Sequence, residues 1–242
     1  MLITLICEEN LYSVFLPEKV RGKYWIEDPE KANDDPKRKI LSIEEQEKKW
    51  CVRSGRKLQL YQLEDMQPAT RIILEAGKMY AVEFDKKKKG YIFAEPFTED
   101  RCRFRKYNVK NGAIVNIGSG SDNQIRIKNP YVSAIHAQLS YVDGIWTILD
   151  NNSSNGIFVN EKRIYRTKKL ELGDLIYILG VKIIVGPCFL AMNNPDNSVS
   201  LHTDLLTVYK PEAVLPYETP DEVIEKTYYR SPRFEKDITP LQ

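Results

Sequence analysis

The chain has 242 residues, of which 42% are hydrophobic and 29% are charged, a composition typical of a globular protein with room for two domains of roughly 100 residues each. Lys and Arg exceed Asp and Glu by only two, 36 against 34, which argues against a global attraction to nucleic acid or anionic lipid. Four scattered cysteines and two histidines argue against a disulfide framework and a structural zinc site, and they indicate a reducing compartment.

Short apolar or alternating runs with turn residues between them fill the first half of the chain. The run from Leu2 to Cys7 lacks a basic leader and is too short for a signal peptide, so it predicts a first strand. Further strands are predicted at residues 12–16, 23–26, 50–53, 58–61, 71–74, 79–84 and 91–94. This spacing is typical of a β-sandwich and leaves little room for helices. No stretch approaches the roughly 18 apolar residues of a membrane span.

The second half repeats this rhythm after a polar connection. Residues 95–107 mix Pro96 and acidic side chains with a basic run, which predicts a short exposed connection between two domains, with rigid side-by-side packing of the domains as the alternative. Strands are then predicted at residues 114–117, 124–127, 137–141, 145–149, 156–159, 169–172, 175–179 and 182–185. After residue 192 the chain becomes rich in asparagine and then in proline, which predicts an extended tail rather than a third domain.

The two halves keep marker residues at one offset, as a duplicated domain should. Trp50 and Trp146 lie 96 residues apart, and so do Gly77 and Gly173. In each half the glycine stands at a turn into an apolar strand, where its tolerance of positive φ is useful. The halves therefore look like copies of one domain.

We therefore expect an all-β chain of two tandem sandwiches followed by an extended, proline-containing tail. The expected division is residues 1–96 for the first sandwich, 97–102 for a linker, 103–192 for the second sandwich and 193–242 for the tail.

Three short motifs lie between the predicted strands of the second half. They are Gly118-Ser119, Ser133-x-x-His136 and Asn155-Gly156. Together they resemble the forkhead-associated (FHA) domain, a β-sandwich whose loops bind phosphothreonine peptides and whose pattern is Gly-Arg, Ser-Arg-x-His and Asn-Gly. Both arginines of that pattern are missing, because Ser119 and Ala134 occupy their positions. The first half resembles a degenerate FHA domain that keeps none of these residues.

The resemblance implies a role for each matched residue. Ser133 would donate to a phosphate, His136 would brace the loop from within, and Asn155 would hold the peptide backbone. Serine cannot supply the bidentate, charge-assisted contact of the missing arginines. The candidate peptide-binding residues are Ser119, Ser133 and Asn155, with Arg126 and Lys128 as the nearest replacement cations, and the scaffold positions are Gly118, His136 and Gly156. The alternative is that Ser133 and His136 only satisfy a buried turn.

Enzyme chemistry is not expected from these motifs. A Ser-His-Asp hydrolase using Asp150 would need a nucleophile elbow and an oxyanion loop, and the glycine-serine turn lacks the Gly-Lys-Ser/Thr of a phosphate-binding loop. No metal and no cofactor are expected. The basic cluster at residues 86–89 is interpreted as a solvated loop at a hairpin tip, with contact to an acidic partner or anionic lipid as the alternative. A second basic cluster lies at residues 163–169.

The whole chain resembles the cytosolic N-terminus of EssC-type membrane ATPases of Firmicute type VII secretion systems. The resemblance rests on the degenerate first domain, the better-kept second domain and a tail that contains Arg230-Ser231-Pro232-Arg233. In that family this stretch precedes a transmembrane segment and ATPase domains of the FtsK/SpoIIIE kind. The resemblance implies a non-catalytic module on the cytoplasmic side of the cell membrane. It would bind other proteins of the secretion machine without phosphorylation, and the rival hypothesis is a phosphothreonine sensor.

Overall fold

The computed structural model describes residues 1–63, 66–85, 88–96, 103–194, 198–201 and 206–209. These residues form strands, turns and loops, with no α-helix among them, and the strands are organised in four sheets. The prediction of an all-β chain is confirmed. The proposed linker at residues 97–102 and most of the proposed tail lie outside the described residues.

Residues 2–95 form an N-terminal sandwich of two sheets. Sheet A has the strand order β2-β1-β10-β9-β6-β7, and sheet B has the order β3-β4-β5-β8. The strands are β1 (Leu2–Cys7), β2 (Asn10–Phe15), β3 (Lys23–Glu27), β4 (Lys39–Gln46), β5 (Lys49–Arg53), β6 (Leu58–Gln62), β7 (Pro68–Ala69), β8 (Arg71–Ile73), β9 (Met79–Phe84) and β10 (Lys88–Glu95). Apolar side chains of both sheets meet around Trp50, whose indole packs edge-on against the Tyr24 ring with 5.1 Å between the ring centres.

The C-terminal sandwich begins after Phe104 and also has two sheets. Sheet C has the order β17-β16-β19-β20-β21-β11-β23, and sheet D has the order β18-β15-β14-β12-β13-β22. The strands are β11 (Arg105–Val109), β12 (Ala113–Gly118), β13 (Ile125–Ile127), β14 (Ala137–Val142), β15 (Ile145–Asp150), β16 (Phe158–Val159), β17 (Lys162–Arg163), β18 (Thr167–Leu170), β19 (Leu175–Ile178), β20 (Val181–Val185), β21 (Phe189–Met192), β22 (Val199–Leu201) and β23 (Leu206–Tyr209).

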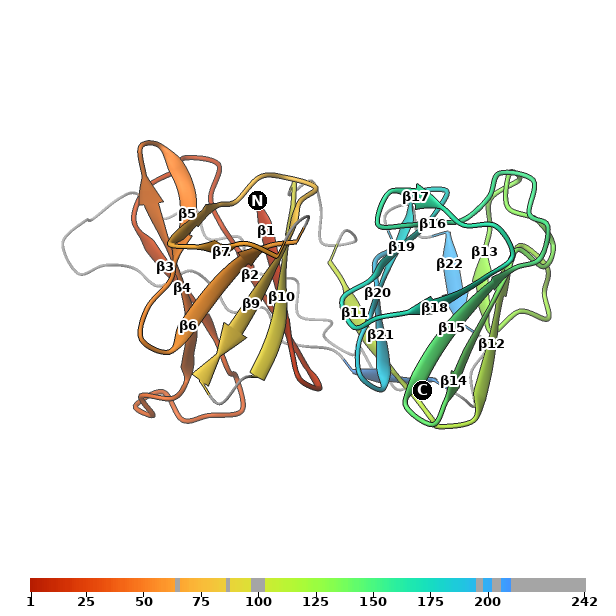
Figure 1. Cartoon of the computed structure of the whole chain (residues 1–242), viewed down its shortest axis with the longest axis horizontal. Helices are drawn as coiled ribbons and strands as arrows, with labels where there is room; N and C mark the ends of the chain where they lie inside the picture. The colour runs from red at the N-terminus through yellow and green to blue at the C-terminus, as the bar shows by residue number, and fades with distance from the viewer. Residues whose placement is uncertain (64–65, 86–87, 97–102, 195–197, 202–205, 210–242) are drawn as a thin grey trace, which may run out of the picture.

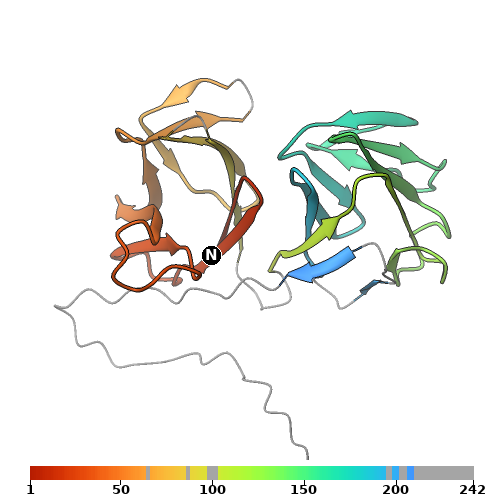
Figure 2. The ribbon, with the colours of Figure 1, turned by 90° about the horizontal axis from the view of Figure 1, so that it is seen from below.

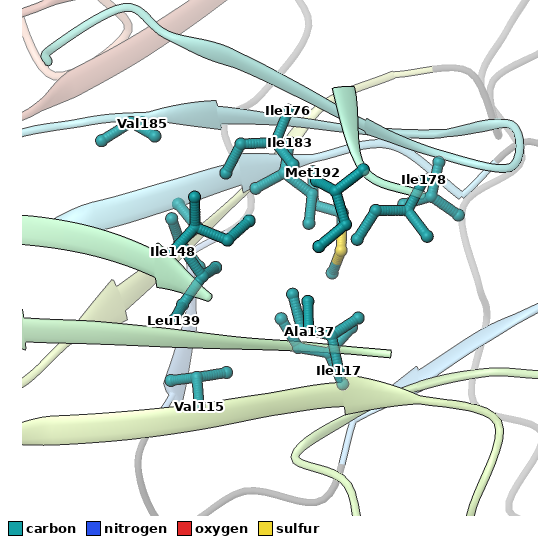
Figure 3. Packing of buried hydrophobic residues seen from close by; sticks show 14 of the residues in the cluster. Val115, Ile117, Ala137, Leu139, Ile148, Ile176, Ile178, Ile183, Val185 and Met192 are labelled. Atoms are coloured by element: carbon teal, nitrogen blue, oxygen red, sulfur yellow. The ribbon is translucent and has the colours of Figure 1, made fainter. Parts of the chain in front are cut away.

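Branched aliphatic side chains fill the space between sheets C and D. Val115, Leu139 and Ile148 of sheet D face Ile176 and Ile183 of sheet C in this core (Figure 3), and all five are buried. Inward residues alternate with outward ones along β12 and β14, as expected for a sheet with one buried face. This core fixes the ends of β12 and β14, between which the loops with the Gly118-Ser119 and Ser133-x-x-His136 motifs lie.

Sheets A and C share a strand order. The six strands of sheet A, β2-β1-β10-β9-β6-β7, correspond to six neighbouring strands of sheet C, β11-β21-β20-β19-β16-β17, and sheet C has β23 as a seventh strand beside β11. Gly77 and Gly173, the paired markers of the sequence, both have positive φ, 82° and 86°. One difference stands out, because the place of the N-terminal strand β1 is taken in sheet C by β21, which directly follows β20 in the chain.

The C-terminal sandwich extends past residue 192, where the sequence predicted an extended tail. Strand β22 pairs with β13 in sheet D, and β23 pairs with β11 in sheet C. The expected boundary is therefore too early for the described residues 199–201 and 206–209. These strands are only three and four residues long, which is too short for the alternation of apolar and polar residues in them to stand out in the sequence.

The outer faces of sheets A and C lie against each other, so the four sheets stack in the order B, A, C, D (Figures 1 and 2). A third buried cluster fills this contact: Ile6, Leu11, Phe93, Phe104, Ile184, Phe189 and Ala191. Two polar contacts cross it, since Lys182 Nζ binds the Glu95 carboxylate and Lys106 Nζ donates to the Glu9 carbonyl. The two sandwiches thus share a core of their own.

This contact corrects the prediction that residues 95–107 form an exposed connection. Among the described residues of that segment, Phe104 is fully buried, and Glu95 and Lys106 are only 6% and 8% exposed. The basic character misled the prediction, because long lysine stems can bury their methylenes while the ammonium reaches a polar partner. Lys106 does so at the Glu9 carbonyl.

Candidate functional site

The three motifs meet at one end of the C-terminal sandwich, which we call the recognition end and define as residues 118–136, 150–157 and 163–166. The turn after β12 lies against the loop before β14. A Cβ atom added to Gly118 would lie 2.3 Å from the Ala134 carbonyl oxygen, so only glycine fits there without a backbone shift. The buried Asn123 fixes this approach by donating from Nδ2 to the carbonyls of Gly120 (2.9 Å) and Ala134 (2.7 Å).

Ser119 is used to hold the loops together. Its hydroxyl donates to the Val132 carbonyl at 2.8 Å, and its backbone N–H donates to the Ser133 carbonyl at 3.0 Å. A ligand that needed the Ser119 hydroxyl as a donor would have to break the first of these bonds. The side chain that stands in the place of the first missing arginine is thus already engaged.

His136 is fully buried and connects two of the motifs. Its Nδ1 accepts a hydrogen bond from the Ser133 backbone N–H at 3.1 Å, and its Nε2 lies 3.2 Å from the Gly156 carbonyl. Because Nδ1 is an acceptor, the imidazole is the neutral tautomer that carries its proton on Nε2 and donates to Gly156. The ring therefore fixes the position of both loops.

The Ser133 hydroxyl points toward Ser154 and not toward the imidazole. It accepts from the Ser154 backbone N–H at 3.2 Å, and the two hydroxyl oxygens are 3.5 Å apart. A serine nucleophile would need its hydroxyl within hydrogen-bond reach of a base. In the described part of the chain, Ser133 and Ser154 instead form a hydroxyl pair at the surface, which suits binding of a polar ligand.

Asn155 lies exposed at the tip of the next loop, followed by Gly156 with φ of 77°. Its Nδ2 donates to the Tyr131 carbonyl at 2.7 Å, which ties this loop to the loop that carries Ser133. Its Oδ1 has no hydrogen-bond donor among the described residues. The exposed Asn155 therefore keeps an amide oxygen that could accept a hydrogen bond from a backbone N–H of a bound segment.

The two candidate replacement cations differ in position. Arg126 lies beside Gly118 in the parallel pairing of β12 and β13, and its Nε donates to the Ser119 carbonyl at 3.0 Å. The exposed Lys128 makes a backbone bond to Ser198 at 2.7 Å, and its side chain makes no contact with the loops within the described residues. Of these two residues, Arg126 is therefore the cation that the fold brings to the Gly118-Ser119 turn.

Three large side chains at the recognition end are exposed, and the motifs did not point to them. Tyr131 is 70% exposed, Ile135 is 57% exposed and Tyr165 is 78% exposed. Tyr131 and Ile135 flank Ser133 in the sequence, while Tyr165 follows Arg163, whose guanidinium lies 5.6 Å from the tyrosine ring centre. The sequence contains no signal that separates such loop residues from buried ones, because loops lack a hydrophobic period.

The described part of the chain also bears on three other kinds of site. It contains no group of three or more His, Cys, Asp and Glu side chains arranged to hold a metal ion. None of its segments is a helix long and apolar enough to cross a membrane. A groove of about 970 Å³ opens beside the contact between the sandwiches, lined by Glu8, Glu9 and Lys88 on one side and by residues 170–172 on the other.

Comparison with protein families finds a similarity for the segment that contains this site. Residues 115–179 match the FHA domain family, and the matched segment contains all three motifs. FHA domains are non-catalytic protein-interaction modules that typically bind phosphothreonine peptides. A comparison with curated proteins found no match.

Several solved structures resemble the chain. The N-terminal FHA domain of EssC, a component of the bacterial type VII secretion apparatus, is 15% identical with a TM-score of 0.37, and the alignment covers 87% of this chain and 99% of that one. The FHA-2 domain of the Mycobacterium tuberculosis ABC transporter Rv1747 is 27% identical with a TM-score of 0.29, covering 45% and 83%. The FHA domain of the CT664 protein from Chlamydia trachomatis is 18% identical with a TM-score of 0.29, covering 38% and 96%.

Proposed function

We propose that the recognition end binds a segment of another protein without requiring a phosphate on it. The observation that carries this proposal is the exposure of Tyr131, Ile135 and Tyr165 around the motif loops. Exposed tyrosines supply large contact area at low cost in conformational entropy and are enriched among the residues that dominate binding energy. The Asn155 acceptor would hold the backbone of the bound segment, while the apolar side chains would supply the contact area.

The phosphothreonine alternative is retained because part of the expected phosphate site is present. The Ser133 hydroxyl lies at the surface beside Ser154, and the Arg126 guanidinium lies at the Ser119 turn. Against it stands the absence of arginine at both family positions, since a bidentate guanidinium is the strong element of phosphate recognition. Phosphate binding by this end would have to rely on Arg126 alone among the candidate cations that contact the loops.

A paired titration tests the two functions. A degenerate peptide library is prepared with phosphothreonine and with plain threonine at its central position, and binding to the chain is measured by fluorescence anisotropy. We expect equal binding of the two forms, weakened by Ile135→Ala and unchanged by the matched variant Ile114→Ala, whose isoleucine is 51% exposed on β12. A strong preference for the phosphorylated form that disappears in Ser133→Ala would replace our proposal with the phosphosensor.

We further propose that the chain is the cytoplasmic part of an EssC-type ATPase and contacts other components of a type VII secretion machine. Support comes from the sequence: two halves with markers at one offset, and a tail that contains Arg230-Ser231-Pro232-Arg233. The tail lies outside the described residues. Sequencing the gene beyond codon 242 tests this directly, because an FtsK/SpoIIIE-type motor should follow a membrane span in the same reading frame. A stop codon at that point would overturn the proposal.

A further inference from the structure

At the recognition end, Arg163 is a cation that neither the FHA pattern nor the candidate residues include. It lies in β17 opposite Phe158 and is exposed. Its guanidinium carbon is 5.6 Å from the centre of the Tyr165 ring, a distance at which a cation is attracted to an aromatic face. Among the described residues it has no carboxylate partner.

The guanidinium also lies against the backbone of the Asn155-Gly156 turn. A Cβ atom added to Gly156 would be 2.6 Å from Arg163 Nε and 2.9 Å from Cζ. Glycine at this position therefore serves two purposes, since it adopts φ of 77° and it leaves room for the arginine. The side chain is thus held between a ring and a turn, so ligand binding would cost it little conformational entropy.

The charges around it favour an anionic partner. The charged side chains of the recognition end are four cations, Arg126, Lys128, Arg163 and Arg166, and two anions, Asp122 and Asp150. Both anions already have local partners, because Asp150 accepts from the Ser153 backbone N–H at 2.8 Å and Asp122 accepts from the Ser121 hydroxyl at 2.9 Å. The excess of two positive charges is therefore available to a ligand.

We propose that Arg163 binds the carboxylate of an aspartate or glutamate in the partner segment, next to the backbone position held by Asn155. The partner would then be an unmodified acidic segment with apolar side chains that pack on Tyr131 and Tyr165. A guanidinium can bind a carboxylate through two parallel N–H···O bonds, which a lysine cannot reproduce. This inference rests on the proposed binding function and names the chemistry of its partner.

The test is selection of a random, unmodified peptide library displayed on phage against the whole chain. Enriched peptides should contain an acidic residue. One of them is then synthesised with its acidic residue intact and with the matching amide in its place, and both forms are titrated. Arg163→Gln should weaken binding of the acidic form about tenfold, the value of one charge-assisted contact of about 1.4 kcal/mol, and should leave the amide form unchanged. Arg163→Lys should recover only part of the loss.

Arg105→Gln provides the matched control, because this arginine is exposed in β11 outside the recognition end. Enriched peptides that bind Arg163→Gln and wild type equally would overturn the role of Arg163 and leave the binding function intact. The same selection is run against a Tyr131→Ala, Tyr165→Ala double variant. If the wild type enriches no peptide beyond those that the double variant enriches, the binding function itself fails, and this inference fails with it.

Discussion

Phe93→Ala should destabilise the whole molecule even though its ring lies outside both sandwich cores. The Phe93 side chain belongs to a residue that is 1% exposed and lies in the buried cluster between sheets A and C. There its ring packs edge-on against Phe104, with 5.4 Å between the ring centres. Lys182 of the other sandwich places its ammonium 5.3 Å from the ring centre. Removing a buried phenyl ring costs about 3–5 kcal/mol, a large share of the roughly 5–15 kcal/mol that stabilises a typical domain.

The assay is urea unfolding followed by tryptophan fluorescence, combined with hydrogen exchange measured separately over each sandwich. The wild type should unfold in one transition, since Trp50 and Trp146 report on sandwiches that share a core. In Phe93→Ala the loss should appear as faster exchange in both sandwiches. Tyr165→Ala, at a side chain 78% exposed, should change stability by less than about 0.5 kcal/mol. A loss below about 1 kcal/mol for Phe93→Ala, confined to strands of sheet A, would refute the shared core.

Three further predictions concern single sites. His136→Ala should lower the free energy of unfolding by about 2–5 kcal/mol in thermal or urea unfolding, because it leaves the Ser133 N–H and the Gly156 carbonyl without their hydrogen-bond partner. Wild-type stability in this variant would show that the imidazole does not brace the loops. Gly118→Ala should lower the free energy of unfolding by about 1–3 kcal/mol in the same assay, because the added methyl group would lie 2.3 Å from the Ala134 carbonyl oxygen. An unchanged unfolding midpoint would mean that the loop shifts without cost to make room. Burial raises the pKa of the Cys7 thiol from 9.0 to about 11, which lowers the fraction of the reactive thiolate. Iodoacetamide at neutral pH should therefore modify Cys7 more slowly in the folded chain than in urea. Equal rates of modification would contradict the raised pKa. Since folding raises this pKa, the thiol's contribution to stability is complete below pH 9.0 and is lost as the pH rises toward about 11.

Strands with strong patterns could be predicted from the sequence, and strands with mixed patterns could not. Residues 79–84 were predicted as a strand and form β9 with those bounds. The β4 strand was missed, because Leu41 and Ile43 face the core between outward polar and acidic side chains and the segment looks like a charged loop. In β1 five consecutive residues are buried, four of them aliphatic and one a threonine, and such a nearly continuous apolar run is typical of a strand covered on both faces. The run therefore contained the signal for the contact between the sandwiches.

The candidate site shows the same division. Local motifs identified Ser133, His136 and Asn155, and the fold places them within one set of hydrogen bonds at one end of the sandwich, although their functions remain proposals. The local motifs did not assign Asn123 or Arg163 to the site, although Arg163 belongs to a basic cluster that the sequence shows. Their positions depend on which strands pair and which loops meet, and that information lies in contacts between residues far apart in the chain.

The pairing of β22 and β23 sets the smallest piece of this protein that should be handled alone. Each strand covers a neighbour whose hydrogen-bonding groups would otherwise face solvent, β13 in one sheet and β11 in the other. A fragment cut at residue 192, the boundary suggested by the composition, would expose both edges as templates for pairing with other chains. Such a fragment should self-associate more readily than one that ends after Tyr209, even with its apolar core intact, because it loses the two strands that pair with β11 and β13.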